Sequence, residues 1–472
     1  MGEYKIKSKE GTEFCFTPKL LIFMKTKGKK KTKRIESFPV VRSHAAGIDV
    51  GDTEMVVAVS PDVCVENVRT FGTFSCDHDQ IVYFLQDCGI KHVAMESTGI
   101  YWVQLFLRLQ EEEFDVILAN AKTIKNVSGR KDDENDAMWI QRLHSCGLIN
   151  GSFQPDNQTR ALRDLTRHRR TLVRDQSRCL NRMIKALELM NIKIQTVISD
   201  IDGQTGKAIV EAILAGEREA SVLASLASKR IKASRQVLIK SLQGNWNTQA
   251  LFLLKQNYAA YNFISTQITE TDFEGEQHLQ RLIATYNGGE LPLIDHKQAR
   301  KRSTRKNTIP FNATAYLKTL LRTDLTQIPG ISELTALELI AETGKDMNKW
   351  PTENHFSSWL AIVPNTKKSG GKIISNKVMK KKQRAGQTLR MAAFTLKRSN
   401  TPLGNYYRKQ QAKGGPAKAV LATATKMAIA IYNMILKQQP YKPEKMIESQ
   451  HKFKEQQIRN LEARLAILKA AA

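Results

Sequence analysis

Cysteine, acidic residues and long apolar runs are all scarce in this 472-residue chain. Its six cysteines form no CxxC pair and no metal-binding spacing, which argues against a disulfide framework or a structural zinc site. We find no run that approaches the roughly 18 continuous apolar residues of a membrane span, and KLLIFM near the start is too short for a signal-sequence core. We therefore expect an intracellular protein with no membrane partner.

The shortage of acids leaves a large positive charge. The chain has 73 Lys and Arg against 46 Asp and Glu, a formal net charge of +27. Such a balance favours a polyanionic partner, most often nucleic acid, although a generic solubilising surface is the alternative. Hydrophobic residues make up 41% of the sequence, which is enough to build real cores in two to four domains.

The first part of the chain predicts a basic leader and then an α/β domain. The leader, residues 1–44, contains KTKGKKKTKR, a run typical of a flexible arm that touches phosphates without sequence preference. Residues 45–155 predict three strands, followed by alternating helices and strands, which is the order of an RNase H-like fold. The expected elements are strands at AAGIDV, TEMVVAVS and CVENVRTF, a helix over about 78–89, a strand at HVAME, a helix from Tyr101 to Glu112, a strand at FDVILAN, and a final helix that carries Asp133 and Asp136.

Residues 156–294 change character. Leucine, methionine, tyrosine and isoleucine recur at helical spacing in two long stretches, with Lys, Arg and Gln between them. This pattern predicts an α-helical coiled-coil or antiparallel helical arm. Arg169 and Gln176 fall on the apolar seam, so the heptads are imperfect. The stripes could pack as an internal core or form a dimer interface, and the sequence favours neither.

Residues 295–437 predict a mainly α C-terminal domain that begins with the basic linker HKQARKRSTRKNTI. Pro329 and Gly330 then lie between two short helical stretches. Two helices joined in this way resemble a helix-hairpin-helix, whose turn amides can hold a DNA phosphate without reading bases, but a plain helix-helix corner fits equally well. The segment VPNTKKSGGKIISN interrupts the helical pattern, and residues 438–472 predict a charged helical tail.

Four acids in the α/β domain indicate a metal site. Asp49 lies on the first strand, Glu96 ends the later strand HVAME, and Asp133 and Asp136 are three apart at the start of a helix, where they share a face. Carboxylates that converge repel one another unless a cation lies between them, and oxygen-only ligands select ions such as Mg²⁺. Each acid alone could be a turn or helix cap; we assign Asp132 that capping role and Asp133 the metal.

The segment KKSGGK holds a second candidate. Ser369 precedes two glycines, so its backbone can approach a substrate closely, and Lys367, Lys368 and Lys372 can neutralise a phosphate. Such a serine can act as a nucleophile if a base takes its proton, but His355 is no obvious base, and a turn with a solvated serine is the alternative. The segment lacks the spacing of a P-loop, so nothing supports ATP use.

Several segments together resemble the DEDD-type insertion-sequence transposases, from about residue 44 to residue 437. They are HAAGIDVG, MESTGIYW, NAKTIKNVSGRKDDENDA, IPGI, WLAIVPNTKKSGGKIISNK, LRMAAFTLKRS and GNYYRKQQAKGGPAKAVLATATKMA. The family joins a Holliday-junction-resolvase-like domain to a C-terminal transposase domain with a catalytic serine. The basic leader and the extra acids of the DDEND motif depart from the family's usual pattern.

The resemblance implies a mechanism and partners. It implies Mg²⁺ on Asp49, Glu96, Asp133 and Asp136, and a covalent 5′-phosphoserine on Ser369. It also implies donor and target DNA, a structured non-coding guide RNA, and a tetramer of two dimers in which one subunit's acids act with another's serine. We expect a cytoplasmic, nucleoid-associated protein of a prokaryote.

Taken with this resemblance, the residues predict a DNA recombinase, which the resemblance implies is guided by RNA. The residues expected to contact nucleic acid are Arg130, Lys131, Gly330, Lys367, Lys368 and Lys372. Two other functions remain open: a metal-dependent nuclease or junction resolvase that uses water, and a non-catalytic basic scaffold that binds RNA or DNA.

Overall fold

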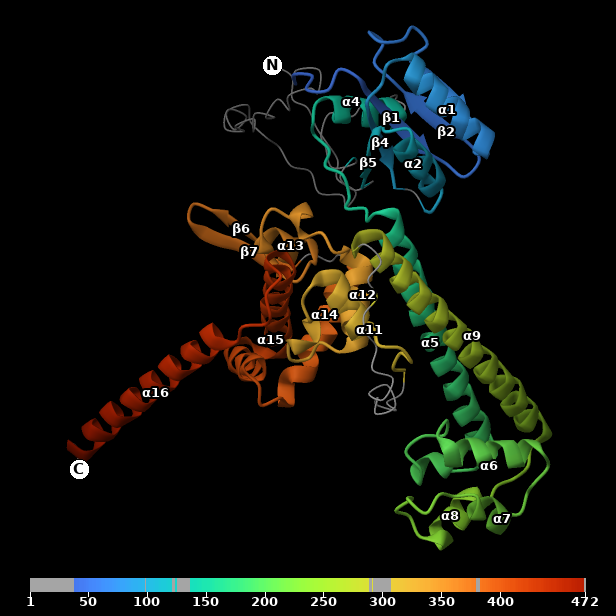
Figure 1. The fold of residues 1–472 in the computed structure, drawn as a ribbon. Helices are drawn as coiled ribbons and strands as arrows, with labels where there is room; N and C mark the ends of the chain where they lie inside the picture. The colour runs from blue at the N-terminus through green and yellow to red at the C-terminus, as the bar shows by residue number, and fades with distance from the viewer. Residues whose placement is uncertain are drawn as a thin grey trace, which may run out of the picture. The chain divides into compact units, whose positions relative to one another are not determined.

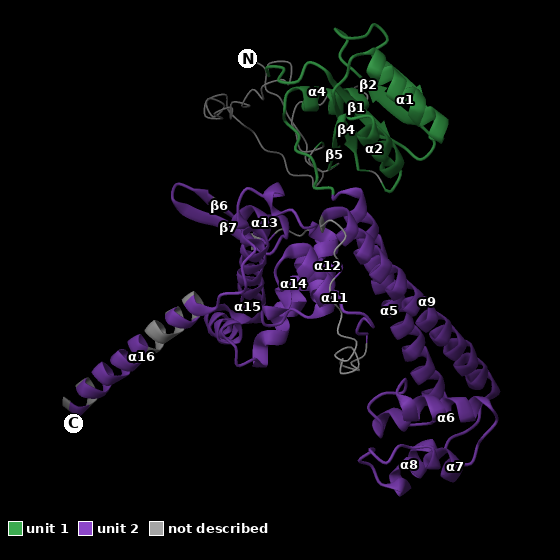
Figure 2. Ribbon diagram, viewed as in Figure 1, with its two compact units in different colours: residues 1–154 green, residues 155–472 purple. Residues whose placement is uncertain are grey.

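The computed structural model describes residues 38–97, 99–120, 124, 136–287, 291, 307–378 and 383–470. It divides into two compact units, residues 1–154 (unit 1) and residues 155–472 (unit 2) (Figures 1 and 2). Most of the basic leader and of the basic linker lies outside the described residues, as do Arg130, Lys131, Asp132 and Asp133.

Unit 1 is built on a five-stranded mixed sheet. Its strands are β1 (Ala45–Val50), β2 (Met55–Ala58), β3 (Val68–Phe71), β4 (His92–Glu96) and β5 (Asp115–Ala119). The spatial order is β3-β2-β1-β4-β5, with β1, β2 and β3 antiparallel and with β4 and β5 parallel to β1. The predicted strands are confirmed, and the arrangement is consistent with the RNase H-like order expected from the sequence.

Helices cover both faces of this sheet (Figure 1). Helices α1 (Ser75–Asp87) and α2 (Trp102–Glu111) bury one face, where Ile48 and Met95 join the core. Helix α4 (Asp136–Ser145) buries the other face against Ala94 and Ala119. Successive side chains of a strand point to opposite faces of the sheet, so neighbouring residues of one strand belong alternately to the two cores.

Unit 2 begins with a long helical arm. Helix α5 (Asn157–Leu189) runs outward and helix α9 (Thr248–Asn287) returns beside it (Figure 1). Their pairing is antiparallel, because Gln158 contacts His278 near the base while Gln176 contacts Ser265 farther out. The predicted stripes pack against each other within one chain, so much of the apolar seam is internal core.

The polar residues on the seam are paired across the two helices. Arg169 donates to Asp272, with side chains only 8% and 5% exposed, and Gln176 donates to the Ser265 hydroxyl at 2.8 Å. Burial raises the pKa of Asp272, and the hydrogen bond from Arg169 opposes that rise. These pairs satisfy groups that would otherwise be costly inside an apolar seam.

The far end of the arm is closed by a small helical cluster that has its own core. Its elements are η3 (Ile194–Thr196), α6 (Gln204–Leu214), α7 (Ala220–Ser225) and α8 (Arg235–Leu242). Leu187 and Met190 at the end of α5, together with Leu254 on α9, complete that core. The glycine-broken segment between the two predicted stripes is thus helical, as expected.

The rest of unit 2 is mainly helical, with one hairpin. The elements are α11 (Ala313–Leu321), η4 (Leu325–Gln327), α12 (Glu333–Thr343), η5 (Met347–Lys349), α13 (Glu353–Trp359), β6 (Pro364–Ser369), β7 (Lys372–Val378), α14 (Arg384–Thr395), η6 (Leu396–Arg398), α15 (Pro402–Lys437) and α16 (Glu444–Ala470). The two-stranded sheet was not predicted: the sequence analysis expected only an interruption there. The charged tail is helical, as expected.

Helix α15 is long and apolar in its second half. By length and composition it is apolar enough to cross a membrane, and half of that apolar window is buried inside the structure. Its backbone leaves helical geometry at Gly414 and Gly415, just before Pro416. Buried residues of its second half, such as Tyr432, pack with Trp350 and Phe356, so this helix contributes to the core of unit 2.

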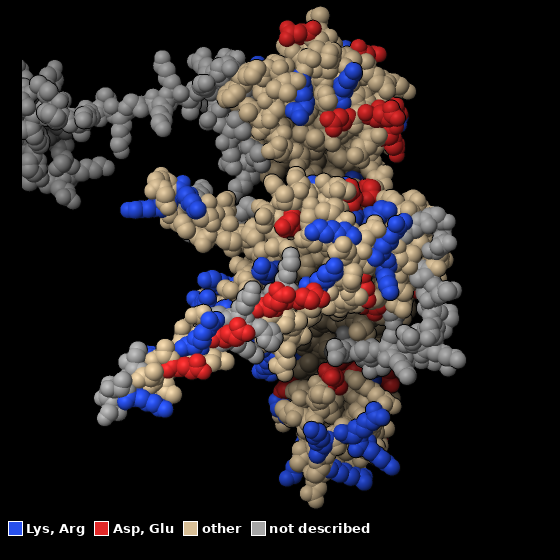
Figure 3. Space-filling view, turned by 60° about the vertical axis from the view of Figure 1, so that its left-hand side comes forward, with Lys and Arg blue, Asp and Glu red and all other residues tan. Residues whose placement is uncertain are grey.

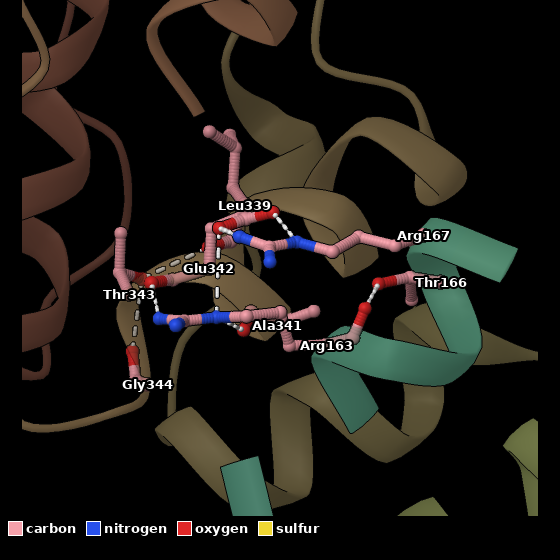
Figure 4. Close-up of polar contacts among 8 residues, drawn as sticks. All are labelled: Arg163, Thr166, Arg167, Leu339, Ala341, Glu342, Thr343 and Gly344. Atoms are coloured by element: carbon pink, nitrogen blue, oxygen red, sulfur yellow. Dashed lines mark hydrogen bonds and ion pairs between the residues drawn. The ribbon is translucent and has the colours of Figure 1, made fainter. Parts of the chain in front are cut away.

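An arginine-glutamate cluster attaches the arm to this helical part. Arg167 on α5 makes a two-pronged hydrogen bond to the Glu342 carboxylate on α12, at 2.8 and 2.7 Å (Figure 4). Arg163 lies 3.5 Å from the same carboxylate and also donates to the Glu342 main-chain oxygen at 2.7 Å. Burial lowers the pKa of Arg163 to about 10, and Glu342 opposes that change.

Removing the charge of Glu342 should loosen this junction. We expect Glu342→Gln to cost about 3 kcal/mol in the free energy of unfolding, because it leaves two partly or fully buried guanidinium groups without a counter-charge. Urea unfolding of the full chain measures this. Asp175→Asn on the same helix is the control: its pair with Arg178 is exposed, so the loss should stay below about 1 kcal/mol. Equal losses in the two variants would contradict the argument.

Candidate active site

Two of the predicted acids lie side by side at the ends of neighbouring strands. Strands β1 and β4 are parallel, with Gly47 opposite Ala94 and Ile48 opposite Met95, so Asp49 comes next to Glu96. Ala94 belongs to the core under α4, and Glu96, two residues later, shares that face. Both acids are partly buried.

Helix α4 runs antiparallel to β1 and brings the third acid to the same end. The Ser145 main-chain oxygen at its end accepts from the amides of Val41 and Arg42, and Gln141 donates to the Ala45 oxygen. One turn earlier, Ala137 lies against Gly47. Asp136, the first residue of the helix, is therefore the one closest to the carboxyl ends of β1 and β4.

Glycine at position 47 is what permits this close approach. A Cβ atom there would lie 2.3 Å from the Ala137 oxygen and 2.3 Å from the Gln141 nitrogen, both of which are backbone atoms. Because Gly47 and Asp49 are two apart on one strand, the face that receives α4 is also the face that carries Asp49. The contact thus fixes the helix start over the acidic end of the sheet.

The donor chemistry of these acids fits a hard cation such as Mg²⁺, which prefers carboxylate oxygens. Among the described residues, however, no three acidic, histidine or cysteine side chains already lie close enough together to hold a metal ion. The remaining predicted ligand, Asp133, precedes α4 and lies outside the described residues. Asp49, Glu96 and Asp136 are therefore an oxygen-rich set on three adjoining elements, and the assignment of the quartet stays a prediction.

Ser369 lies at the tip of the β6–β7 hairpin in unit 2. It pairs with Lys372 across a two-residue turn in which Gly370 and Gly371 have φ angles of +55° and +75°. Two positive φ values describe a type I′ turn, which suits the twist of a tight hairpin and favours glycine. The serine side chain is exposed, and its hydroxyl has no hydrogen-bond partner among the described residues.

The described surroundings of Ser369 supply positive charge, and His355, the nearest histidine in the sequence, is engaged elsewhere. Lys368 and Lys372 flank it and are exposed. His355 lies on α13, where its ring is hydrogen-bonded to Thr352, its own helix cap. A nucleophilic role for Ser369, which stays a prediction, would therefore need a base from another element or from the substrate. The sequence analysis missed the hairpin, although a Gly-Gly pair with Thr366 before it and Ile373 and Ile374 after it is a signal that predicts one.

Gly330 occupies a tight turn packed against another helix. Its φ is +89°, and a Cβ atom there would lie 3.0 Å from the Ala392 oxygen at α14. Pro329 and Gly330 come between η4 and α12, as the sequence predicted. The packing explains the glycine without a ligand, so its contact with DNA stays a prediction.

The end of the arm offers a further basic surface that the sequence analysis did not single out. Residues 220–269 contain no Asp or Glu. Lysine and arginine side chains gather at the end of the arm, at the bottom of Figure 3. The exposed ones there are Lys229, Arg230, Lys232, Arg235 and Lys240. Such a surface fits phosphate groups, whose counterions it can displace.

Two family models match the chain. A model of DEDD type, described as a transposase, matches residues 46–192, and a model described as the transposase IS116/IS110/IS902 family matches residues 322–408. The first range runs from β1 to the end of α5, and the second contains the hairpin with Ser369. Residues 193–321 lie outside both ranges. No curated protein matches the chain closely enough to count as a relative.

Adding one methyl group at Gly47 should displace α4. We expect Gly47→Ala to cost about 2 kcal/mol in the free energy of unfolding, because the clash is with backbone atoms that cannot rotate away. Hydrogen exchange of the α4 amides should become faster. Gly275→Ala is the control: nothing lies within 4 Å of its added Cβ, and the change should be neutral or stabilising. Unchanged α4 protection in Gly47→Ala would refute the proposed constraint.

Proposed function

Because the chain belongs to the IS116/IS110/IS902 family of DEDD transposases, we propose that it cleaves and rejoins DNA strands through its acidic quartet and Ser369. The observation that carries the proposal is the placement of Asp49 beside Glu96 on the face that receives the start of α4. That arrangement concentrates negative charge where a cation and a scissile phosphate can meet.

Asp49, Glu96, Asp133 and Asp136 are the residues proposed to hold Mg²⁺. When bound, the metal supplies charge neutralisation and orientation for a phosphodiester. The side chains contribute by position: β1 and β4 fix two of them rigidly, and α4 brings Asp136 to the same end. With no cation present, the carboxylates repel one another, so the site favours a positive ion.

Ser369 is proposed to carry the covalent step. Its oxygen bonds to phosphorus while the bond to the 3′ oxygen breaks; the serine proton leaves to a base and the 3′ oxygen gains a proton. A 3′ hydroxyl from the partner strand then attacks the phosphoserine and releases the serine. One phosphodiester is exchanged for another, so no ATP is needed. Lys368 and Lys372 stabilise the phosphate, and Lys367, Arg130, Lys131 and Gly330 are further proposed nucleic-acid contacts.

The partners are proposed from the family resemblance and the charge of the chain. They are donor and target DNA, a structured guide RNA, and further copies of the chain in a tetramer of two dimers, where one subunit's acids act with another's serine. The net charge of +27 and the basic end of the arm support a nucleic-acid partner. The expected place of action is the nucleoid in the cytoplasm.

Changing Asp49 to Ala should lower the rate of DNA strand cleavage in Mg²⁺ at least about a thousandfold, since it removes a proposed ligand of the metal that neutralises the phosphate charge. Folding should be intact, because one fewer carboxylate lowers the repulsion in the apo protein. Asp52→Ala, an exposed acid three residues later, is the matched control and should cleave normally. Cleavage by Asp49→Ala at the wild-type rate would contradict the metal proposal.

Changing Ser369 to Ala should remove the covalent adduct while DNA binding persists, because only the nucleophile is lost. Denaturing electrophoresis of labelled DNA shows the adduct as a slow band that protease removes. Ser375→Ala is the matched control: it lies on the opposite strand of the same hairpin, across from Lys367, and should form the band normally.

The same gel separates the rival functions. If the adduct band persists in Ser369→Ala and vanishes in Ser375→Ala, then Ser375 is the nucleophile and Ser369 is not. Cleavage by the wild type with no adduct at all favours a nuclease that uses water. Neither cleavage nor adduct, with binding intact, favours a non-catalytic scaffold.

A further inference from the structure

Helix α5 carries a stripe of arginines on the side that faces away from the seam. A helix has 3.6 residues per turn, so positions three, four and seven apart share a face. The stripe consists of Arg160, Arg163, Arg167, Arg170 and Arg174. It is buried at Arg163, partly exposed at Arg167 and Arg170, and exposed at Arg174. Solvent therefore reaches the outer part of the stripe.

Helix α14 adds a further arginine at the same place. The turn just before α12 lies against the Ala392 oxygen of α14, and Glu338, farther along α12, accepts from the Thr388 hydroxyl at 3.0 Å. The two helices therefore run antiparallel, because a step forward on α12 is a step backward on α14. One turn beyond Glu338 is Glu342, and one turn before Thr388 is Arg384. Arg384 thus lies on the part of α14 nearest to the Glu342 cluster.

Positive charge exceeds negative charge where these helices meet. The Glu342 carboxylate is already matched twice, by the two hydrogen bonds from Arg167 and by Arg163 at 3.5 Å. Arg170 and Arg384 make no hydrogen bond or ion pair with any residue that the structure describes. Their charges are therefore left over for a group from outside the chain.

The arginines also repel one another. The pKa of Arg384 is lowered, first by partial desolvation and then by the positive charge of Arg167. Arg170 and Arg174 lower this pKa further, and Glu342 opposes the change. A guanidinium group keeps its proton in proteins, so the repulsion is not relieved by deprotonation. An anion bound among these side chains would relieve it.

A phosphate group of nucleic acid is the anion that fits these side chains best. Guanidinium groups bind phosphate oxygens through paired hydrogen bonds, which makes arginine the preferred residue for phosphate recognition. Residues 354–443 contain no Asp or Glu, and this stretch includes both α14 and the hairpin of Ser369. The surroundings therefore suit a polyanion that continues beyond one binding point, and not an isolated anion.

We propose that Arg170, Arg174 and Arg384 bind the phosphate backbone of the DNA at the place where α5 and α14 both pack against α12. The contact positions the DNA on unit 2 and reads no base, because phosphates carry no sequence information. It rests on the proposed function for the identity of the nucleic acid: DNA is favoured because α14 follows the hairpin whose serine is proposed to attack DNA. The test needs no cleavage, so failure of this contact and failure of the catalytic proposal are distinguishable.

Neutralising two of the three arginines tests the contact. Fluorescence anisotropy of a labelled DNA duplex measures binding over a range of salt concentrations, with nuclease-treated, full-length protein in the Ser369→Ala background. The double variant Arg170→Gln/Arg384→Gln should bind at least about tenfold more weakly, because two charge-assisted hydrogen bonds are lost. The slope of log K against log salt concentration should become shallower by about 1.8, since each neutralised phosphate releases roughly 0.9 counterion.

Arg178→Gln is the matched control. Arg178 lies one turn beyond Arg174 on the same face of α5, but it pairs with Asp175 at 2.7 Å, so its charge is already matched. The control should therefore change the DNA affinity by less than about threefold and leave the salt slope nearly unchanged. If the control weakened binding as much as the double variant, total charge and not this site would decide affinity, and the proposal would be wrong.

Two further measurements separate the alternatives. Without nucleic acid, the double variant should unfold at an equal or higher urea concentration than its parent, because it relieves repulsion between like charges. A lower urea midpoint with unchanged DNA affinity would mean that these arginines only stabilise unit 2. A labelled hairpin RNA tests the ligand: if the double variant binds RNA more weakly but DNA as tightly as before, DNA is the wrong partner. Either result, or an unchanged affinity and salt slope for DNA, overturns the proposal.

Discussion

The approach of α4 to β1 at Gly47 is the contact on which the candidate site depends. It places a helix backbone against a strand backbone, with no side chain between them. The same contact closes the core around Trp139 and Ile140, so the stability of unit 1 and the position of Asp136 have a common origin. If α4 moved away from β1, unit 1 would lose part of its core and Asp136 would leave the acidic end of the sheet. The free energy of core packing therefore opposes the repulsion among the carboxylates.

A different principle holds unit 2 together. Its arm is long and thin, and polar pairs hold it at defined positions: Arg169 with Asp272 on the seam, and Arg163 and Arg167 with Glu342 at the base. Buried ion pairs contribute little net free energy but penalise every misaligned register. They therefore set which residues of α5 and α9 lie opposite one another, and with that the composition of each outer face.

Much of this could be predicted from the sequence, and the rest could not, for physical reasons. The order of three strands followed by alternating helices and strands predicted the sheet. Because the carboxyl ends of parallel neighbouring strands lie at the same edge of a sheet, that order also predicted that Asp49 in AAGIDV and Glu96 in HVAME lie close together. The seam residues Arg169 and Gln176 were noticed, but not their partners, which lie about 90 to 100 residues away. The Glu342 cluster was missed for the same reason. The hairpin was missed because helical surroundings outweighed a local Gly-Gly signal.

The hairpin that carries Ser369 has a consequence for how such a protein can change state. Its tip is a turn whose two glycines have nothing within 4 Å of an added Cβ atom, so no described element packs against the turn at those positions. The geometry of the serine is set by the strand pairing and the turn of the hairpin itself. We expect a hairpin built in this way to keep its own shape wherever a partner or substrate meets its tip.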